Sequence, residues 1–277
     1  MNITIPKPVR NAGIKAPFQL LLNSPNGTPG APQDPSVSGT SANFTVNFGN
    51  NKIYFPEGAR VALDKWSFNN SIFNISSNLK NNLIGYTPDP SIPADTVSIT
   101  LPDGNYALSD ISNYLQAVMI ANGVPQSSLI TLSVNLSTLQ CFVNLGDGTY
   151  KLDLTQGTLW QQIGALEQEI VISSGLLDNV VNLFQVSNLL LHTNLISGFT
   201  TFLNSGSSDI LYNAPITVGA GYFQPENPTY KAFLPVASRE LSEITIYITD
   251  QNNNPISFQG QPQNIGLIFD YTHAINP

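Results

Sequence analysis

Alternating apolar and polar residues near the end of the chain predict a β-strand. In LSEITIYITDQNNNPISF, residues 241–258, one face of the strand would carry Ile244, Ile246 and Ile248, and the other Thr245, Tyr247 and Thr249. We expect the isoleucines in a core and the polar face toward solvent or a neighbouring subunit. Asp250 to Asn254 predict a turn, and Pro255 limits pairing at the start of a second strand. The segment is therefore expected to form a closing hairpin.

Short apolar runs separated by turn-forming residues recur along the chain. The expected strands cover residues 18–22, 44–48, 52–55, 59–68, 72–75, 83–86, 96–101, 129–134, 139–145, 149–154, 169–172, 182–186, 189–196, 209–214, 231–236 and 265–271. The letters GNN between 44–48 and 52–55, and LGDGTY between 139–145 and 149–154, predict two hairpins.

One longer segment, YALSDISNYLQAVMIANG, has the period of an amphipathic helix. Its apolar residues recur three and four apart, at Ile111, Leu115, Val118 and Met119. Ser109 is the expected N-cap, and Gly123 and Pro125 are expected to end the helix. A second, shorter helix is expected over residues 158–166. Many strands with one or two short helices in the connections predict an all-β protein, an antiparallel β-sandwich or jelly roll.

The start of the chain differs in composition from the rest. Residues 1–41 contain a Pro-, Gly- and Ser-rich stretch and are expected to form an extended arm and linker. Residues 42–277 are expected to form the jelly-roll domain. The extra strands within 129–215 are expected to form a loop elaboration or a small insertion on this domain.

Charge narrows the classes of function. Charged residues make up 10% of the 277 residues, and the formal net charge is −8. Lys7, Arg10 and Lys15 stand in the first fifteen residues without an acid, so the remainder is strongly acidic. An acidic body argues against a protein that wraps nucleic acid. The basic arm either contacts phosphate or an acidic neighbouring subunit, or is a disordered terminus.

The cysteine count and the lack of targeting patterns indicate the compartment in which the protein is expected. Cys141 is the only cysteine, so an intrachain disulfide is excluded, and its apolar surroundings predict a buried thiol. The opening residues, MNITIPKPVR, lack the apolar region of a signal peptide, and no apolar run is long enough for a membrane-spanning helix. The protein is expected in a reducing compartment, without a membrane span.

The search for catalytic groups finds no convincing set. His192 lies in an apolar strand and is expected to be structural, while a Cys141–His192 nucleophile and base lacks any supporting signature. The carboxylate pairs Glu167–Glu169 and Glu240–Glu243 lack the aromatic residues that usually line a sugar cleft. They are interpreted as solvated charges at the ends of elements.

Metal and cofactor motifs are equally weak. Residues 250–254 have the composition of a calcium loop without its spacing, so a turn is the preferred interpretation. Neither a phosphate-binding glycine motif nor a G-x-S-x-G motif occurs. We therefore assign no catalytic, cofactor-binding or metal-binding residues, and expect no enzyme and no cofactor.

Several segments, taken in order, resemble a known family. They are ARVALDKWSFNNSIFNISSNLKNN (59–82), LPDGNYALSDISNYLQAVM (101–119), LHTNLISG, SDILYNAPI and the late ITDQNNNPISF (248–258). This order resembles the small capsid proteins of virophages and Maverick/Polinton-type viruses, most of all their penton, or minor capsid, protein. The resemblance covers residues 42–271.

The resemblance implies a single upright jelly roll that forms homopentamers at the fivefold vertices of an icosahedral virion. It implies contacts with the neighbouring major capsid protein, location in the virion, and assembly inside the host cell, in the cytoplasm. The arm with Lys7, Arg10 and Lys15 would then reach an adjacent subunit or packaged DNA. The two-roll, hexon-like major capsid protein of these viruses is a less suitable match, because the chain is short for two rolls.

A different class of function stays open. A receptor- or glycan-binding spike, or a lectin-like module, can be built on a similar sandwich, and it would expose aromatic residues in its loops. Tyr222 and Phe223 in GAGYFQPENP, residues 219–228, are the candidate exposed contacts. The alternative for these two residues is a packed loop or a contact between subunits.

Overall fold

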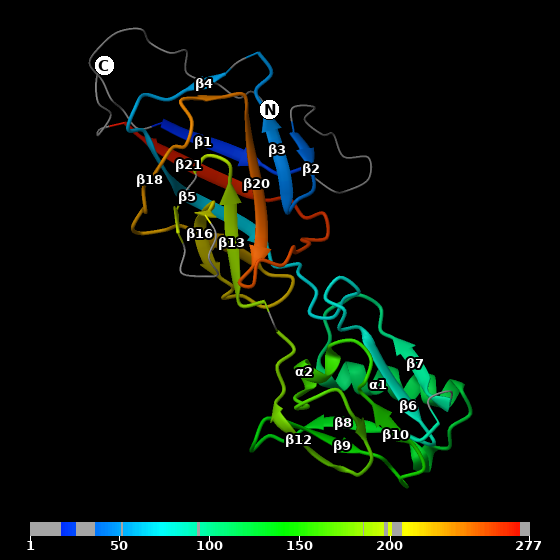
Figure 1. The fold of residues 1–277 in the computed structure, drawn as a ribbon. Coiled ribbons are helices and arrows are strands. Elements are labelled where there is room, and N and C mark those ends of the chain that lie inside the picture. The colour runs from blue at the N-terminus through cyan, green and yellow to red at the C-terminus, as the bar shows by residue number, and fades with distance from the viewer. Residues whose placement is uncertain are drawn as a thin grey trace. The chain divides into compact units, whose positions relative to one another are not determined.

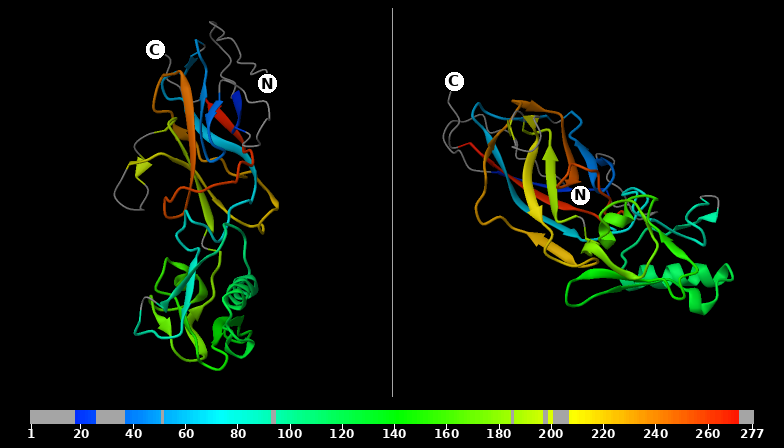
Figure 2. Two further views of the ribbon diagram at one scale, coloured as in Figure 1. Left: turned by 90° about the vertical axis from the view of Figure 1, so that its right-hand side faces the viewer. Right: turned by 60° about the horizontal axis from the view of Figure 1, so that its bottom comes forward.

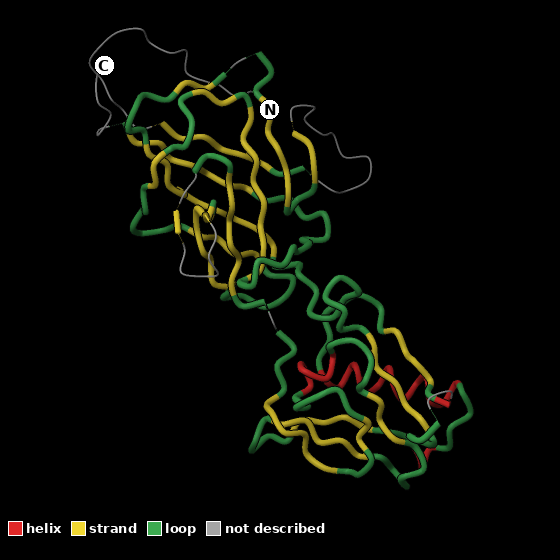
Figure 3. The backbone as a smooth tube through the Cα atoms, viewed as in Figure 1, coloured by secondary structure: helices red, strands yellow, loops and turns green. Residues whose placement is uncertain are grey.

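The computed structural model describes residues 18–25, 37–50, 52–92, 95–184, 186–196, 199–200 and 207–271. These residues form two compact units. Unit 1 takes in the described residues up to Ile72 and again from Val186 onward, and unit 2 is the intervening Phe73–Gln185. The chain thus leaves unit 1, completes unit 2 and returns (Figure 1). Figure 3 shows strands in both units and the described helices in unit 2.

The first sheet of unit 1 brings together the beginning and the end of the described chain. Its order is β1-β21-β5-β17, and β18 also pairs with β5; all pairings are antiparallel. The strands are β1 (Phe18–Asn23), β5 (Arg60–Asn69), β17 (Phe223–Glu226), β18 (Leu234–Pro235) and β21 (Asn264–Asp270).

The second sheet of unit 1 has the order β16-β13-β20-β3-β2 and is also antiparallel. Its strands are β2 (Val37–Gly39), β3 (Asn43–Asn47), β13 (Asn188–Thr193), β16 (Ile210–Pro215) and β20 (Glu243–Asp250). Two short pairs accompany the sheets: β4 (Ile53–Tyr54) with β19 (Glu240–Leu241), and β14 (Phe199–Thr200) with β15 (Ser207–Ser208).

The two sheets of unit 1 form separate layers, as the views in Figure 2 show, and residues of both sheets make up its core. Its largest fully buried side chains are aromatic: Phe44, Trp66, Phe68, Phe258 and Phe269. Burial of such side chains on the inner faces of two antiparallel sheets is the main stabilising contribution in a β-sandwich. The prediction of an antiparallel β-sandwich with a jelly-roll fold is confirmed.

Unit 2 has its own sheets, helices and core. One sheet has the order β11-β10-β6-β7 and the other β12-β9-β8. The elements are β6 (Leu83–Thr87), β7 (Val97–Thr100), α1 (Leu108–Ala121), β8 (Thr131–Val134), β9 (Gln140–Asn144), β10 (Lys151–Asp153), α2 (Leu159–Ile163), β11 (Ile170–Val171) and β12 (Gly175–Val180), with a 3₁₀ turn at Gln126–Ser128.

The apolar face predicted for α1 is buried in unit 2. Ile111, Leu115 and Met119 are completely buried there. The predicted N-cap is wrong: Ala107 caps the helix, and its backbone N–H donates to the Asp110 carboxylate at 2.8 Å. Asp110 therefore performs the capping expected of Ser109, because a side chain in the first turn can satisfy the free backbone donors.

The domain boundaries differ from the expected ones. Within the expected arm, residues 1–41, β1 pairs along its whole length with β21, and β2 pairs with β3. The alternation of FQLLLN buries Leu20 and Leu22, so this segment belongs to the core of unit 1 despite its Pro-rich surroundings. An elaboration or small insertion was expected within 129–215, but the separate unit covers 73–185. Residues beyond 185 return to unit 1, where β13 and β16 complete its second sheet.

The predicted hairpins are wrong. The strand at 43–47 pairs with β2 and β20, while the one at 53–54 pairs with β19. Likewise β9 pairs with β8 and β12, while β10 pairs with β6 and β11. At the end of β20 the second strand is reduced to a single bridge between Thr249 and Pro255. Burial against distant strands outweighs these local turn preferences.

Candidate functional site

The structure places only some of the predicted contact residues. Lys7, Arg10 and Lys15 lie outside the described residues. Tyr222 and Phe223 are strongly exposed, with 70% and 58% of their surface accessible. Phe223 is the first residue of β17, at one edge of the first sheet. The role of these two aromatic residues as contacts stays a prediction.

Buried polar residues hold the loop that carries this aromatic pair. The Asn70 side chain donates to the Val218 carbonyl at 2.9 Å, and the Asn70 backbone bonds with both Gly221 and Tyr222. The buried Gln224 side chain accepts from the Thr217 N–H at 3.1 Å and donates to the Pro215 carbonyl at 2.7 Å. The two rings are thus presented on an ordered segment, which lowers the entropy lost on contact.

A polar network lies on the outer face of the second sheet of unit 1, around His192. Its Nδ1 atom is 2.8 Å from Asp209 Oδ1, and its Nε2 atom is 2.9 Å from Thr249 Oγ1. Tyr247 donates its hydroxyl to the other Asp209 oxygen at 2.5 Å. A carboxylate can only accept, so His192 donates from Nδ1 to Asp209, and its Nε2 atom is left for the Thr249 hydroxyl.

The network affects the acidity of Tyr247. Burial raises the pKa of its phenol above the usual value, and the hydrogen bond to Asp209 raises it further. Tyr247 thus keeps its hydroxyl proton, and this proton forms the hydrogen bond to Asp209. The arrangement from Thr249 through His192 to Asp209 has the order of a hydrolytic triad, but Thr249 is 7% exposed and hydrogen-bonded within the sheet. We interpret the network as a support that fixes the ring of Tyr247.

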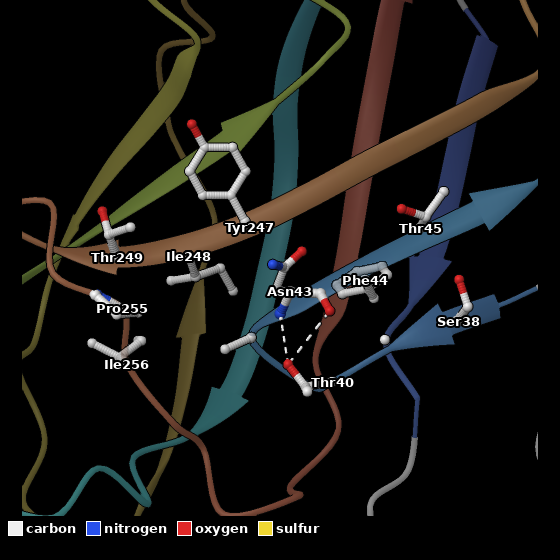
Figure 4. A pocket seen from close by; sticks show the side chains of 12 residues that line it. Ser38, Thr40, Asn43, Phe44, Thr45, Tyr247, Ile248, Thr249, Pro255 and Ile256 are labelled. Atoms are coloured by element: carbon white, nitrogen blue, oxygen red, sulfur yellow. Dashed lines mark hydrogen bonds between the residues drawn. The ribbon is translucent and has the colours of Figure 1, made fainter. Parts of the chain in front are cut away.

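A pocket of about 420 Å³ adjoins this network on the same sheet (Figure 4). Asn43 and Thr45 on β3 and Tyr247 and Thr249 on β20 contribute to its lining. Ser38 to Thr40 border it on one side, and Pro255 and Ile256 on another. None of its twelve lining residues has a charged side chain.

A tight turn shapes one rim of the pocket. The Thr40 hydroxyl accepts from the Asn43 N–H at 3.0 Å, and the Thr40 N–H donates to the Asn43 carbonyl at 2.7 Å. Gly39 has a φ of +108°, and an added Cβ would lie 2.3 Å from the Asn43 oxygen. Only glycine fits such a turn without displacing the backbone.

The residues considered for catalysis are not brought together. Cys141 belongs to the core of unit 2, where burial raises its pKa to about 12, whereas His192 belongs to unit 1. Glu240 forms an ion pair with Lys52, and Glu243 is exposed at the start of β20. Glu167 is exposed and Glu169 is half-buried, in a turn region before β11. No chemistry is supported at these carboxylates.

The Asp250 turn uses its carboxylate internally. One oxygen accepts from the Asn252 and Asn254 backbone N–H groups at 2.8 Å, and the other from the Asn254 side chain at 2.9 Å. This is the geometry of a side-chain-stabilised turn, the preferred interpretation of residues 250–254. Among the described residues, no three His, Cys, Asp or Glu side chains are grouped as a metal site. No helix in the described part is long and apolar enough to cross a membrane.

Sequence reasoning missed both the polar network and the pocket. His192 and Thr249 are 57 residues apart and meet only through the pairing of β13 with β20. The one available signal was the polar face of residues 245–249, opposite the buried isoleucines. That alternation indicates a polar surface, but it does not show which histidine or carboxylate lies beside it.

Comparisons with known proteins identify the fold. No protein-family model matches the chain, and no curated protein matches it. A chain of the cryo-EM structure of the Sputnik virophage is 12% identical, with a TM-score of 0.42 over 92% of this chain and 97% of that one. The crystal structure of the mavirus penton protein is 10% identical, with a TM-score of 0.50, over 92% of this chain and 99% of that one. Because so little of this chain is left unmatched, the likeness extends over both units, and the chain shares the fold of the mavirus penton protein.

Proposed function

We propose that this chain is a structural capsid protein, and that it forms homopentamers at the fivefold vertices of an icosahedral virion. The observation that carries the proposal is the fold likeness to the mavirus penton protein, which extends over nearly all of both chains. A rigid sandwich that carries few charges suits close packing against identical neighbours around a closed ring. The role is structural rather than catalytic.

The aromatic edge of unit 1, defined by Tyr222 and Phe223, is the proposed contact with a neighbouring subunit or with the major capsid protein. Exposed aromatic side chains held on an ordered loop are favourable anchors of an interface. Pro225 lies within β17 at the same edge and cannot donate a backbone hydrogen bond. Association there would therefore use side chains, and open-ended strand pairing is disfavoured.

The basic residues Lys7, Arg10 and Lys15 complete the proposal. Their charge complements both the phosphates of packaged DNA and the acidic side chains of an adjacent subunit; residues 73–185 alone hold two basic and nine acidic side chains. We propose location in the virion after assembly in the host cytoplasm. A truncation that tests the arm should remove residues 1–17 only, because β1 contributes Leu20 and Leu22 to the core.

The mass of the purified protein at increasing concentration tests the vertex assignment. We expect five copies by native mass spectrometry or sedimentation, and a particle with fivefold symmetry by electron microscopy. Tyr222→Ser combined with Phe223→Ser should weaken the association by about tenfold or more, because interface aromatics often contribute more than 1 kcal/mol each.

The matched control is Tyr54→Ser, which removes an aromatic ring that is 61% exposed on β4. It should leave the oligomer unchanged. A protein that stays monomeric at high concentration would contradict a capsid role. A stable trimer would instead favour a hexon-like subunit or a spike.

A further inference from the structure

We propose that the pocket over β3 and β20 binds a neutral carbohydrate. The site is formed within unit 1, and the proposal does not depend on the vertex assignment. Its volume of about 420 Å³ lies within the range of pockets that hold small ligands. Three properties of its lining support a sugar: a fixed aromatic ring, free hydrogen-bonding groups and the lack of charge.

The aromatic surface is the ring of Tyr247. Strand register places His192, Tyr247 and Asn43 side by side on β13, β20 and β3. His192 stacks on the Tyr247 ring from the β13 side, with the ring centroids 4.2 Å apart and the planes 10° from parallel. The opposite side of Tyr247 therefore borders Asn43 and the pocket, as Figure 4 illustrates. An aromatic face is a suitable platform for the apolar C–H face of a pyranose ring.

Hydrogen-bonding groups lie beside this platform without internal partners. The exposed side chains of Asn43 and Ser38 form no hydrogen bond within the described part of the chain, although both border the pocket. A carboxamide both donates and accepts, and a hydroxyl does the same, so together they can bind adjacent sugar hydroxyls. By contrast, the Thr45 hydroxyl is paired with that of Thr245 at 3.0 Å, and Thr40 bonds within its turn.

The charge pattern selects a neutral ligand. No lining residue is charged. Asp209, which bonds to the lining residue Tyr247, already accepts hydrogen bonds from His192 and Tyr247. Asp250, which follows the lining residue Thr249, accepts hydrogen bonds within its own turn. A phosphate or sulfate would find no cation among the lining residues, and an amine would find no free carboxylate. A neutral polyhydroxylated ligand loses no ionic solvation on entering.

The backbone of the pocket floor disfavours an extended peptide. β3 is paired with β2 on one side and β20 on the other, and β20 is paired with β3 and β13. The backbone groups of β3 and β20 are therefore engaged in the sheet. Strand addition, the usual way of binding an extended chain, is not available along these two strands. Side-chain groups at fixed positions suit a ring with several hydroxyls better.

Binding of the full chain to an array of neutral oligosaccharides, built from hexoses and N-acetylhexosamines, tests this proposal. The oligosaccharide retained best is then titrated by calorimetry. We expect Asn43→Ala to weaken its affinity by about tenfold, since each hydrogen bond to a neutral partner contributes on this scale. Ser38→Ala should weaken it about threefold to tenfold for the same reason. Tyr247→Phe keeps the ring, so its loss should be smaller than that of Asn43→Ala.

The matched control is Asn213→Ala, which changes an exposed asparagine on β16 of the same sheet, outside the pocket. It should bind as the unchanged protein does, and thermal melting should show that all variants are folded. Equal affinities for Asn43→Ala and Asn213→Ala would overturn the proposal, as would an array without a retained neutral glycan. Competition by a synthetic peptide of residues 1–17 at this pocket would overturn it in favour of arm binding. The mass of the oligomer, measured on the same sample, tests the capsid proposal independently. A failure of glycan binding can therefore be told apart from a failure to form pentamers.

Discussion

The imidazole of His192 lies flat on the phenol ring of Tyr247, and both side chains bond to the same carboxylate, that of Asp209. The two residues are directly opposite on neighbouring strands of an antiparallel pair. Cross-strand aromatic pairs of this kind stabilise a sheet and fix its register. Here the pair also reaches the pocket, because Tyr247 lines it together with Asn43.

The first prediction concerns alkaline pH. The pKa of Tyr247 is raised in the folded protein, so the phenol is harder to ionise there than in the unfolded chain. Its contribution to stability is fully present below the unfolded pKa, about 10, and is lost as the pH rises through the higher folded value. The free energy of unfolding, measured by urea denaturation, should therefore be lower at pH 10.5 than at pH 8. Burial raises the pKa of Tyr271 in the same direction.

Tyr247→Phe isolates the contribution of this one residue. At pH 8 the variant should lose about 1 kcal/mol, because Asp209 loses a donor. Between pH 8 and pH 10.5 it should lose less stability than the unchanged protein, since one ionisable phenol is missing. An equal loss in both proteins would show that Tyr247 ionises with an ordinary pKa.

The second prediction concerns the aromatic core of unit 1. Phe269 is fully buried and stacks on Phe18 and Phe55, with ring centroids 4.6 Å and 5.0 Å away. Phe269→Ala should lower the free energy of unfolding by about 3–5 kcal/mol, because a cavity replaces the ring. Tyr54→Ala, at an exposed ring of the same unit, should change it by less than about 0.5 kcal/mol. Urea denaturation followed by circular dichroism compares the two.

The third prediction concerns Gly164, which ends α2. Its φ is +95°, and an added Cβ would lie 2.2 Å from the Asn179 carbonyl oxygen. Gly164→Ala should destabilise unit 2 by about 2 kcal/mol or more, from backbone strain and displacement of the Asn179 segment. Gly175→Ala is the matched control, because nothing lies within 4 Å of a Cβ at that position. Similar melting temperatures for both variants would contradict this account.

The fourth prediction concerns the reactivity of Cys141. The thiol is completely buried, and burial raises its pKa to about 12. At pH 8 only about one thiol in ten thousand would be ionised, and the thiolate is the reactive form. A thiol reagent should therefore label the unfolded protein fully and the native protein hardly at all. Rapid labelling under native conditions would mean that unit 2 opens far more readily than its core suggests.

The periodic positions of the chain were predictable from sequence, because they depend on local geometry. Ile244, Ile246 and Ile248 are buried as expected, and so are Ile111 and Leu115 on α1. Alternation with a period of two or of 3.6 residues directly reports which side of an element faces a core. The all-β class follows from the same patterns.

Strand partners and the candidate site were not predictable in this way. Thr45 pairs with Thr245, two hundred residues further on, while the GNN turn signal pointed to a local hairpin. The insertion of unit 2 separates the strands of the sandwich, so sequence proximity does not indicate their order. The pocket depends on the same distant pairings, because Asn43 reaches Tyr247 only through the register of β3 with β20.

The insertion of unit 2 also orders events during protein synthesis. Every described strand of unit 2 lies between residues 83 and 180, so this unit is complete while β13, β16, β20 and β21 are still to be translated. The early strands β1, β3 and β5 must wait for partners from the last part of the chain. Their apolar faces are exposed during that interval, and long-range pairing of this kind is slow. The nascent chain thus carries a folded unit 2 before the sandwich of unit 1 can close, and the interval before β20 and β21 are made is the stage most open to aggregation.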